Sequence, residues 1–141
     1  TEIQAALGIS QLKRLDKFVK IRNSLFKVYS NLLKDEPIRM LDIPENTYSA
    51  LHLAIIRLND PRKRFHKLIF EEMRKKNIGV QLHYQPVHLQ PFYKKLGFKK
   101  GYLGNAEKYY KRCLSIPLHQ GLTKVEIDFV VQEIENFLIH L

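Results

Sequence analysis

The sequence predicts an α/β (α+β) domain with two layers, in which helices pack on a short, largely antiparallel three-stranded sheet. Three short, mostly apolar runs alternate along the chain with longer stretches whose apolar residues recur at helical spacing. The runs that predict strands are residues 50–58, 79–84 and 114–118. The chain has 141 residues, the size of one domain, and such a domain can bury a core without disulfides or metals.

Residues 1–33 predict one long helix. Thr1 and Gln4 fit a capping box, so we expect the helix to begin at residue 1. A helix of about 33 residues is long for a small domain, and we expect it either to bend near Arg22 or to project toward a partner domain that this chain lacks. The side chains expected on its buried stripe are Ile3, Leu7, Leu12, Leu15, Val19, Phe26, Tyr29 and Leu33.

The middle of the chain predicts a connection, a strand and a helix. Residues 35–46 contain two prolines and indicate a surface connection. His52 lies within the strand expected at 50–58, where an internal, hydrogen-bonded histidine is the simplest interpretation. Asp60 and Pro61 suit the start of a helix, and Asn77 suits a left-handed turn at its end. The side chains expected on the buried face of that helix are Phe65, Leu68, Ile69 and Met73.

The last third of the chain predicts an irregular stretch at 86–98, a helix, the third strand and a final helix. Asn105 is the expected cap of the first helix, which would bury Ala106, Tyr109, Tyr110 and Cys113. Thr123 and Glu126 form a second capping box pattern. The expected buried face of the final helix consists of Ile127, Val130, Val131, Ile134, Leu138 and Leu141.

Composition limits the class of protein. The single cysteine excludes an internal disulfide framework and is typical of a reducing, cytoplasmic setting. No apolar run approaches the roughly 18 residues of a membrane span, and we expect no membrane partner. The net charge of +10 favours anionic partners, but the lysines and arginines are spread over several elements, as on ordinary solvated faces.

The stretch Gly79–Tyr93 is the richest in groups that recognise polar ligands. It gathers histidines, tyrosines and glutamines around two prolines, which suits a binding loop at the end of a strand. The alternative is a solvated loop whose aromatic rings pack locally. His83, His88 and His119 match no zinc spacing, so a metal site is not expected. Cys113 falls on the expected apolar stripe of a helix and is interpreted as a small hydrophobic residue rather than a nucleophile.

Three segments carry a resemblance to a known family. The opening TEIQAALGISQLKRLDKF, the central KNIGVQLHYQPVHLQPFYKKLGFKKG and the later AEKYYKRCLSIPLHQGLT resemble the small domain of the DegT/DnrJ/StrS-type sugar aminotransferases, in the family's order. The form HYQPVHLQPFY is most similar to the enzymes that aminate a UDP-linked 4-keto-6-deoxy sugar for pseudaminic acid synthesis.

The resemblance implies the C-terminal part of a fold-type I homodimer that uses pyridoxal phosphate (PLP). In such enzymes a large-domain lysine holds PLP, glutamate is the usual amino donor, and C4 of the keto sugar is aminated. Residues 1–34 would connect to the preceding large domain, and residues 48–141 would form a substrate-loop subdomain. Since no lysine here lies in the matching motif, we expect this chain to bind no PLP and to be inactive alone.

The resemblance also implies the substrate contacts. Gln81, Leu82, His83 and Tyr84 would line the nucleotide-sugar site, with His88 a weaker candidate and Tyr93 weaker still. On a strand, Gln81 and His83 would face one side and Leu82 and Tyr84 the other.

Two functions of other classes compete with this interpretation. A basic nucleic-acid-binding module would need exposed aromatic residues beside clustered cations, whereas the aromatic residues here fall mostly on apolar stripes. A helical interaction module would use residues 1–33 as a docking helix.

Overall fold

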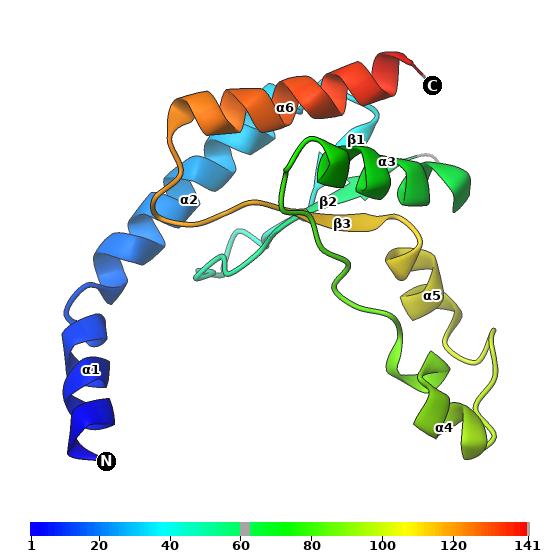
Figure 1. Ribbon diagram of the computed structural model, residues 1–141, viewed down its shortest axis with the longest axis horizontal. Coiled ribbons are helices and arrows are strands. Elements are labelled where there is room, and N and C mark those ends of the chain that lie inside the picture. Colours follow the sequence, from blue (N-terminus) through cyan, green and yellow to red (C-terminus); the bar gives the residue numbers. More distant parts are fainter. Residues whose placement is uncertain (60–62, 141) are drawn as a thin grey trace.

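The computed structural model describes residues 1–59 and 63–140, and in these residues it confirms the predicted fold class. Strands β1 (Ile38–Met40), β2 (Ala54–Leu58) and β3 (Cys113–Ile116) form one antiparallel sheet in the order β1-β2-β3. The register pairs Ile56 with Met40 on one side and with Leu114 on the other. Figure 1 shows the sheet at the centre of the molecule, with the longer helices grouped beside it.

Helices occupy most of the remaining described chain. They are α1 (Glu2–Leu12), α2 (Leu15–Leu32), α3 (Lys63–Lys75), a 3-10 helix (Val87–Leu89), α4 (Pro91–Lys95), α5 (Gly104–Tyr110) and α6 (Lys124–Ile139). Both predicted capping boxes are present, at the starts of α1 and α6. Asn77 has a φ of 59° just beyond α3, as its predicted left-handed turn requires.

The core lies where α2, α3 and α6 meet the inner face of the sheet. Along β2, Ala54, Ile56 and Leu58 are buried while Arg57 is exposed, as expected for a strand with one covered face. From the helices, Tyr29 and Ile134 are fully buried against this face. Burial raises the pKa of the Tyr29 hydroxyl far above its ordinary value, so this phenol stays neutral.

The single long helix predicted for residues 1–33 is wrong in two respects. The chain turns at Lys13 and Arg14, which separates α1 from α2, and Arg22 lies inside α2 instead of at a bend. Ile3 is 82% exposed, and α1 buries no side chain. In Figure 1, α1 projects beyond the sheet, and the exposure of its apolar side chains shows that no described element covers them. Projection toward a partner domain, the second alternative, stays a prediction. The other stripe residues without cover are Leu7, Leu12 and Leu15.

The sheet also departs from the prediction. β1 lies inside the expected surface connection, between its two prolines, where Ile38 and Met40 pair with Leu58 and Ile56 of β2. The strand expected over 50–58 begins only at Ala54, so His52 precedes it and is exposed, not internal. Residues 79–84 form no strand; Gln81 alone makes a bridge, to Ser115.

Several helix details differ as well. Residues 86–98 contain the 3-10 helix and α4, whose first residue is Pro91. Leu103, not Asn105, precedes α5, and Cys113 is the first residue of β3 instead of the last on a helical stripe. Ala106 is exposed and Leu68 is 37% exposed, so neither belongs to the core. The expected helix start at residues 60–61, the side chain of residue 65 and residue 141 lie outside what the structure describes.

The packing of α6 predicts a large difference between two isoleucines on the same helix. Ile134→Ala should lower the free energy of unfolding by about 2–5 kcal/mol, because Ile134 is fully buried and its loss leaves a cavity. Ile139 is 77% exposed, and Ile139→Ala should change the free energy by about 0.5 kcal/mol or less. Urea denaturation followed by circular dichroism measures both; equal losses would contradict this placement of α6.

Candidate functional site

The segment predicted to bind substrate is attached to the outer edge of β3. The Gln81 amide donates to the Ser115 carbonyl at 3.1 Å, and the Ser115 amide donates to the Gln81 carbonyl at 2.9 Å. Two residues on, His83 Nδ1 lies 2.6 Å from Ser115 Oγ. Ser115 is itself buried in the sheet. The start of the segment is therefore hydrogen-bonded to β3 through Ser115.

The four side chains of this segment do not lie in a sealed interior. Gln81 is exposed and Tyr84 is 72% exposed, whereas Leu82 is half-buried and packs against the core. His83 is half-buried, and its ring meets the Tyr84 ring edge-on with centroids 4.6 Å apart. Exposure therefore does not alternate from residue to residue, and the predicted two-sided pattern is wrong because only Gln81 is paired as in a strand. The peptide bond between His83 and Tyr84 is cis.

Tyr84 is the side chain of the segment best placed to meet a ligand. Its ring is held from one side by His83 and open on the other, and a tyrosine offers both an aromatic surface and a hydroxyl group. Gln81 adds an amide that can donate and accept hydrogen bonds. The arrangement suits recognition of a polar, ring-shaped molecule. Tyr93, the weakest sequence candidate, lies on α4 against Phe92 and Phe98.

His88, the weaker substrate candidate, is placed differently from the other four. It is 4% exposed, and its Nε2 lies 2.9 Å from Glu107 Oε1 on α5. The backbone amide of Gly101 donates to the same carboxylate oxygen at 2.6 Å. His88 thus faces the Glu107 carboxylate instead of solvent. Its Nε2 is already used in this hydrogen bond and is not available to a ligand.

Glu107 is a buried acid that sequence reasoning missed. It is 5% exposed, and the hydrogen bonds from His88 and Gly101 hold the pKa of its carboxyl below the ordinary value. One signal was available in the sequence: Glu107 is the only acidic residue between Glu72 and Glu126, in a stretch rich in lysine. An isolated acid in such a stretch indicates a specific partner.

The described side chains do not form a metal centre or a reactive thiol. Among residues 1–59 and 63–140, no group of three or more His, Cys, Asp or Glu lies close enough to hold a metal ion. Cys113 is buried in β3, and burial raises the pKa of its thiol. In the same part of the chain, no helix has the length and apolar character that crossing a lipid bilayer requires.

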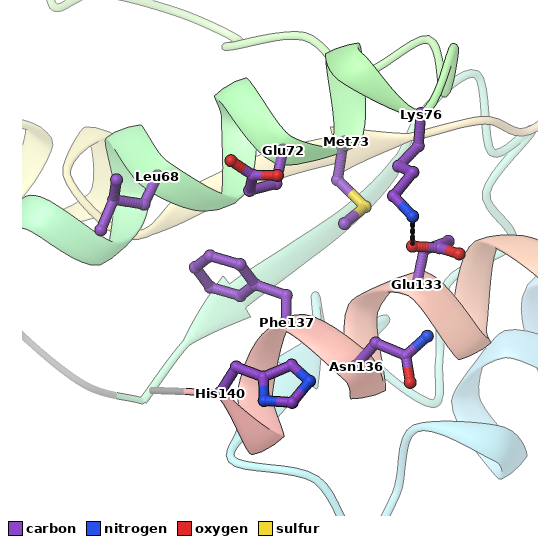
Figure 2. Close-up of a pocket in the computed structure, with 8 residues that line it drawn as sticks. All are labelled: Leu68, Glu72, Met73, Lys76, Glu133, Asn136, Phe137 and His140. Atoms are coloured by element: carbon purple, nitrogen blue, oxygen red, sulfur yellow. Dashed lines mark ion pairs between the residues drawn. The ribbon is translucent and has the colours of Figure 1, made fainter.

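A separate cleft of about 580 Å³ lies between α3 and α6 (Figure 2). Lys76 Nζ and Glu133 Oε2 form an ion pair of 3.2 Å across it, and Phe137 projects into the space between the helices. The lining residues are Leu68, Glu72, Met73, Lys76, Glu133, Asn136, Phe137 and His140. None of them belongs to the predicted substrate segment. Glu72 is paired with Lys75 at 2.6 Å, so the charged groups of this cleft already have protein partners.

The described lysines do not suit a covalent coenzyme site. A lysine that forms a Schiff base works in a desolvated pocket that lowers its pKa. Every lysine side chain that the structure describes is exposed, apart from the half-buried Lys111. The ion pair with Glu72 raises the pKa of Lys75, which is the opposite direction. The described lysines therefore do not fit a Schiff base with PLP.

Comparisons with known proteins agree with the geometry. Residues 1–135 match the model of the DegT/DnrJ/EryC1/StrS aminotransferase family. The UDP-4-amino-4,6-dideoxy-N-acetyl-beta-L-altrosamine transaminase of Campylobacter jejuni is 34% identical over 140 residues, which cover 98% of this chain and 37% of the relative.

Two solved structures are similar throughout this chain. Helicobacter pylori PseC, an aminotransferase involved in the biosynthesis of pseudoaminic acid, has a TM-score of 0.91 at 29% identity, covering 99% of this chain and 38% of that one. The PMP form of the putative sugar aminotransferase Spr1654 from Streptococcus pneumoniae has a TM-score of 0.94 at 28% identity, covering 99% and 35%. The chain therefore spans little more than a third of the length of the relatives it matches.

The buried acid predicts a specific acid sensitivity. The pKa of Glu107 is lowered on folding, whereas an unfolded glutamate titrates near about 4.3. Below about that pH the unfolded chain takes up a proton at this position and the folded chain does not, so stability should fall as the pH falls.

Urea unfolding at a series of pH values would measure this effect. Glu107→Gln should give a shallower loss of stability with falling pH than the wild type. Glu126, whose pKa is lowered by its capping hydrogen bonds to Thr123, contributes equally to both proteins. Identical pH slopes would show that Glu107 is not held as an anion.

Proposed function

Because the chain belongs to the DegT/DnrJ/EryC1/StrS aminotransferase family, we propose that it forms the sugar-nucleotide-binding part of a longer PLP-dependent aminotransferase. The observation that supports this proposal most is the Gln81–Tyr84 segment, which is hydrogen-bonded to the sheet through Ser115 and exposes the Gln81 and Tyr84 side chains. Residues 1–34 connect to a preceding large domain, and residues 48–141 form the substrate-loop subdomain. The longer protein acts in the cytoplasm as a homodimer.

The proposed substrate is a UDP-linked 4-keto-6-deoxy sugar, aminated at C4 with glutamate as donor for surface or flagellar glycan synthesis. The printed name of the Campylobacter relative and the description of the Helicobacter structure support this choice. The net charge of +10 is also consistent with a substrate that carries a diphosphate. Exposed lysines on the region that follows the segment add to this field; they are Lys94, Lys95, Lys99, Lys100 and Lys108.

The residues of this chain bind and orient the sugar nucleotide. Tyr84 contacts the sugar nucleotide either by stacking its ring on it or through a hydrogen bond from its hydroxyl group. Gln81 offers a further polar contact. His83 supports the Tyr84 ring and is anchored by Ser115. Since only part of each relative is matched, the lysine that holds PLP and the groups that move protons belong to the rest of the longer protein.

Tyr84→Ala in the complete polypeptide that carries this chain should raise the KM for the sugar nucleotide roughly two- to tenfold, the range expected for one aromatic contact. The PLP absorbance spectrum should be unchanged, because Tyr84 is proposed to contact the sugar and not the coenzyme. Steady-state kinetics with varied sugar nucleotide provides the measurement.

Tyr48→Ala is the matched control. Tyr48 is 74% exposed, as Tyr84 is 72% exposed, but it lies before β2, away from the segment. Its substitution should leave the KM unchanged. If Tyr84→Ala and Tyr48→Ala both gave wild-type kinetics, the substrate role of the segment would be refuted.

The 141-residue chain alone should convert no keto sugar when mixed with PLP and glutamate. Its described lysines offer no desolvated pocket for the coenzyme. Product analysis by mass spectrometry, beside a circular dichroism spectrum that demonstrates folding, tests this expectation. Any amino sugar above a protein-free control would contradict it.

A further inference from the structure

The proposed substrate segment Gln81–Tyr84 is held at its start, and just beyond its end, by one short stretch of the chain. At its start, Ser115 of β3 binds the backbone of Gln81 and the ring of His83. Four residues beyond Tyr84, Glu107 of α5 binds His88. Residues 107–115 thus provide both of these attachments, and Tyr84 lies between them in the chain.

The attachment at His88 has a defined direction. An ionised carboxylate can only accept hydrogen bonds, so Nε2 of His88 carries the hydrogen that is shared with Glu107 Oε1 at 2.9 Å. His88 Nδ1 is buried and has no hydrogen-bond partner. The pair is thus a charge-assisted hydrogen bond enclosed by protein.

Glu107 also organises the loop before its own helix. Gly101 has a φ of 93°, a left-handed conformation that glycine adopts readily, and its amide is directed at Glu107 Oε1 at 2.6 Å. The Tyr102 ring lies 6.3 Å from the His88 ring and 5.1 Å from the Phe98 ring. One carboxylate therefore connects α5, the loop at Gly101 and the end of the substrate segment.

From this geometry we infer that His88 and Glu107 are positioning residues: their buried hydrogen bond sets the path of residues 84–88 and thereby the orientation of Tyr84 toward the sugar nucleotide. The inference rests on the proposed function, because Tyr84 is the substrate contact in that proposal. Neither residue touches the substrate. Their effect passes through the backbone from the 3-10 helix at Val87–Leu89 to Tyr84.

The test is a double-mutant cycle in the complete polypeptide, with a UDP-linked 4-keto-6-deoxy sugar as probe. Glu107→Leu, which removes the acceptor for His88 and Gly101, should raise the KM for this substrate about fivefold and leave the half-reaction with the amino donor unchanged. In a Tyr84→Ala background the same substitution should have almost no further effect, since Tyr84 is the group through which Glu107 acts. Additive effects of the two substitutions would overturn the inference.

Two variants of His88 distinguish a loss of positioning from a loss of folding. The side-chain amide of glutamine can donate as Nε2 does, so His88→Gln should keep the KM within about twofold of the wild type, whereas His88→Leu should match Glu107→Leu. Glu133→Gln is the control, because the ion pair of Glu133 with Lys76 shares no residue with the segment or with its two attachments. An equal KM rise in Glu133→Gln, or in both His88 variants, would indicate a general structural effect and refute positioning.

The two proposals fail in different ways. If Tyr84→Ala leaves the KM unchanged, the proposed substrate segment itself is wrong. If Tyr84→Ala raises the KM and Glu107→Leu does not, only the positioning role is wrong. Hydrogen exchange adds a readout without catalysis: the Gly101 amide should exchange faster in Glu107→Leu, which has no acceptor, than in wild type, and an unchanged rate would refute the buried hydrogen bond.

Discussion

Hydrogen bonding along both edges of β3 connects the core of the domain to the segment proposed for substrate binding. One edge pairs with β2 from Ala54↔Ile116 to Arg57↔Cys113. The other edge is covered at Ser115, where Gln81 exchanges two backbone hydrogen bonds. All four residues of β3 are buried. The surface-exposed Tyr84 is therefore only three residues from a backbone position that cannot move without disturbing the sheet.

The parts of the fold that local chemistry determines could be predicted from the sequence. Thr123 with Glu126 specifies the start of α6 through hydrogen bonds only three residues apart, and Asn77 specifies a left-handed turn by itself. Helical spacing also identified Ile127 and Ile134 as core residues. These signals act within one or two turns of chain, so their outcome depends little on distant elements.

The failures come from packing that no local pattern contains. Leu7 has the same helical spacing as Tyr29, yet the first is exposed and the second buried, because only α2 lies beside the sheet and α6. β1 has three residues and exists because β2 supplies a partner; Ile38 and Met40 alone are too short a signal. Amphipathic patterns identify which face of an element is apolar, and tertiary structure decides whether anything covers it.

The same distinction between local signals and tertiary contacts applies to the candidate site. The family resemblance predicts Gln81–Tyr84 as the substrate segment, and Tyr84 is on the surface where a ligand can reach it. The resemblance could not assign His88 to the interior, because its partner Glu107 is 19 residues away, nor Ser115 to His83, which is 32 residues away. Pairings over such distances arise only when α5 and β3 fold back against the segment.

The exposed position of α1 determines what stabilises its helical conformation. A helix of 11 residues is marginal in water on its own, even with a capping box. Since α1 buries no side chain, its opening removes no contact from the core, whereas β2 opens only when the whole domain unfolds. The helical population of residues 2–12 therefore follows the local environment of Ile3 and Leu7, and any surface that covers these side chains increases it.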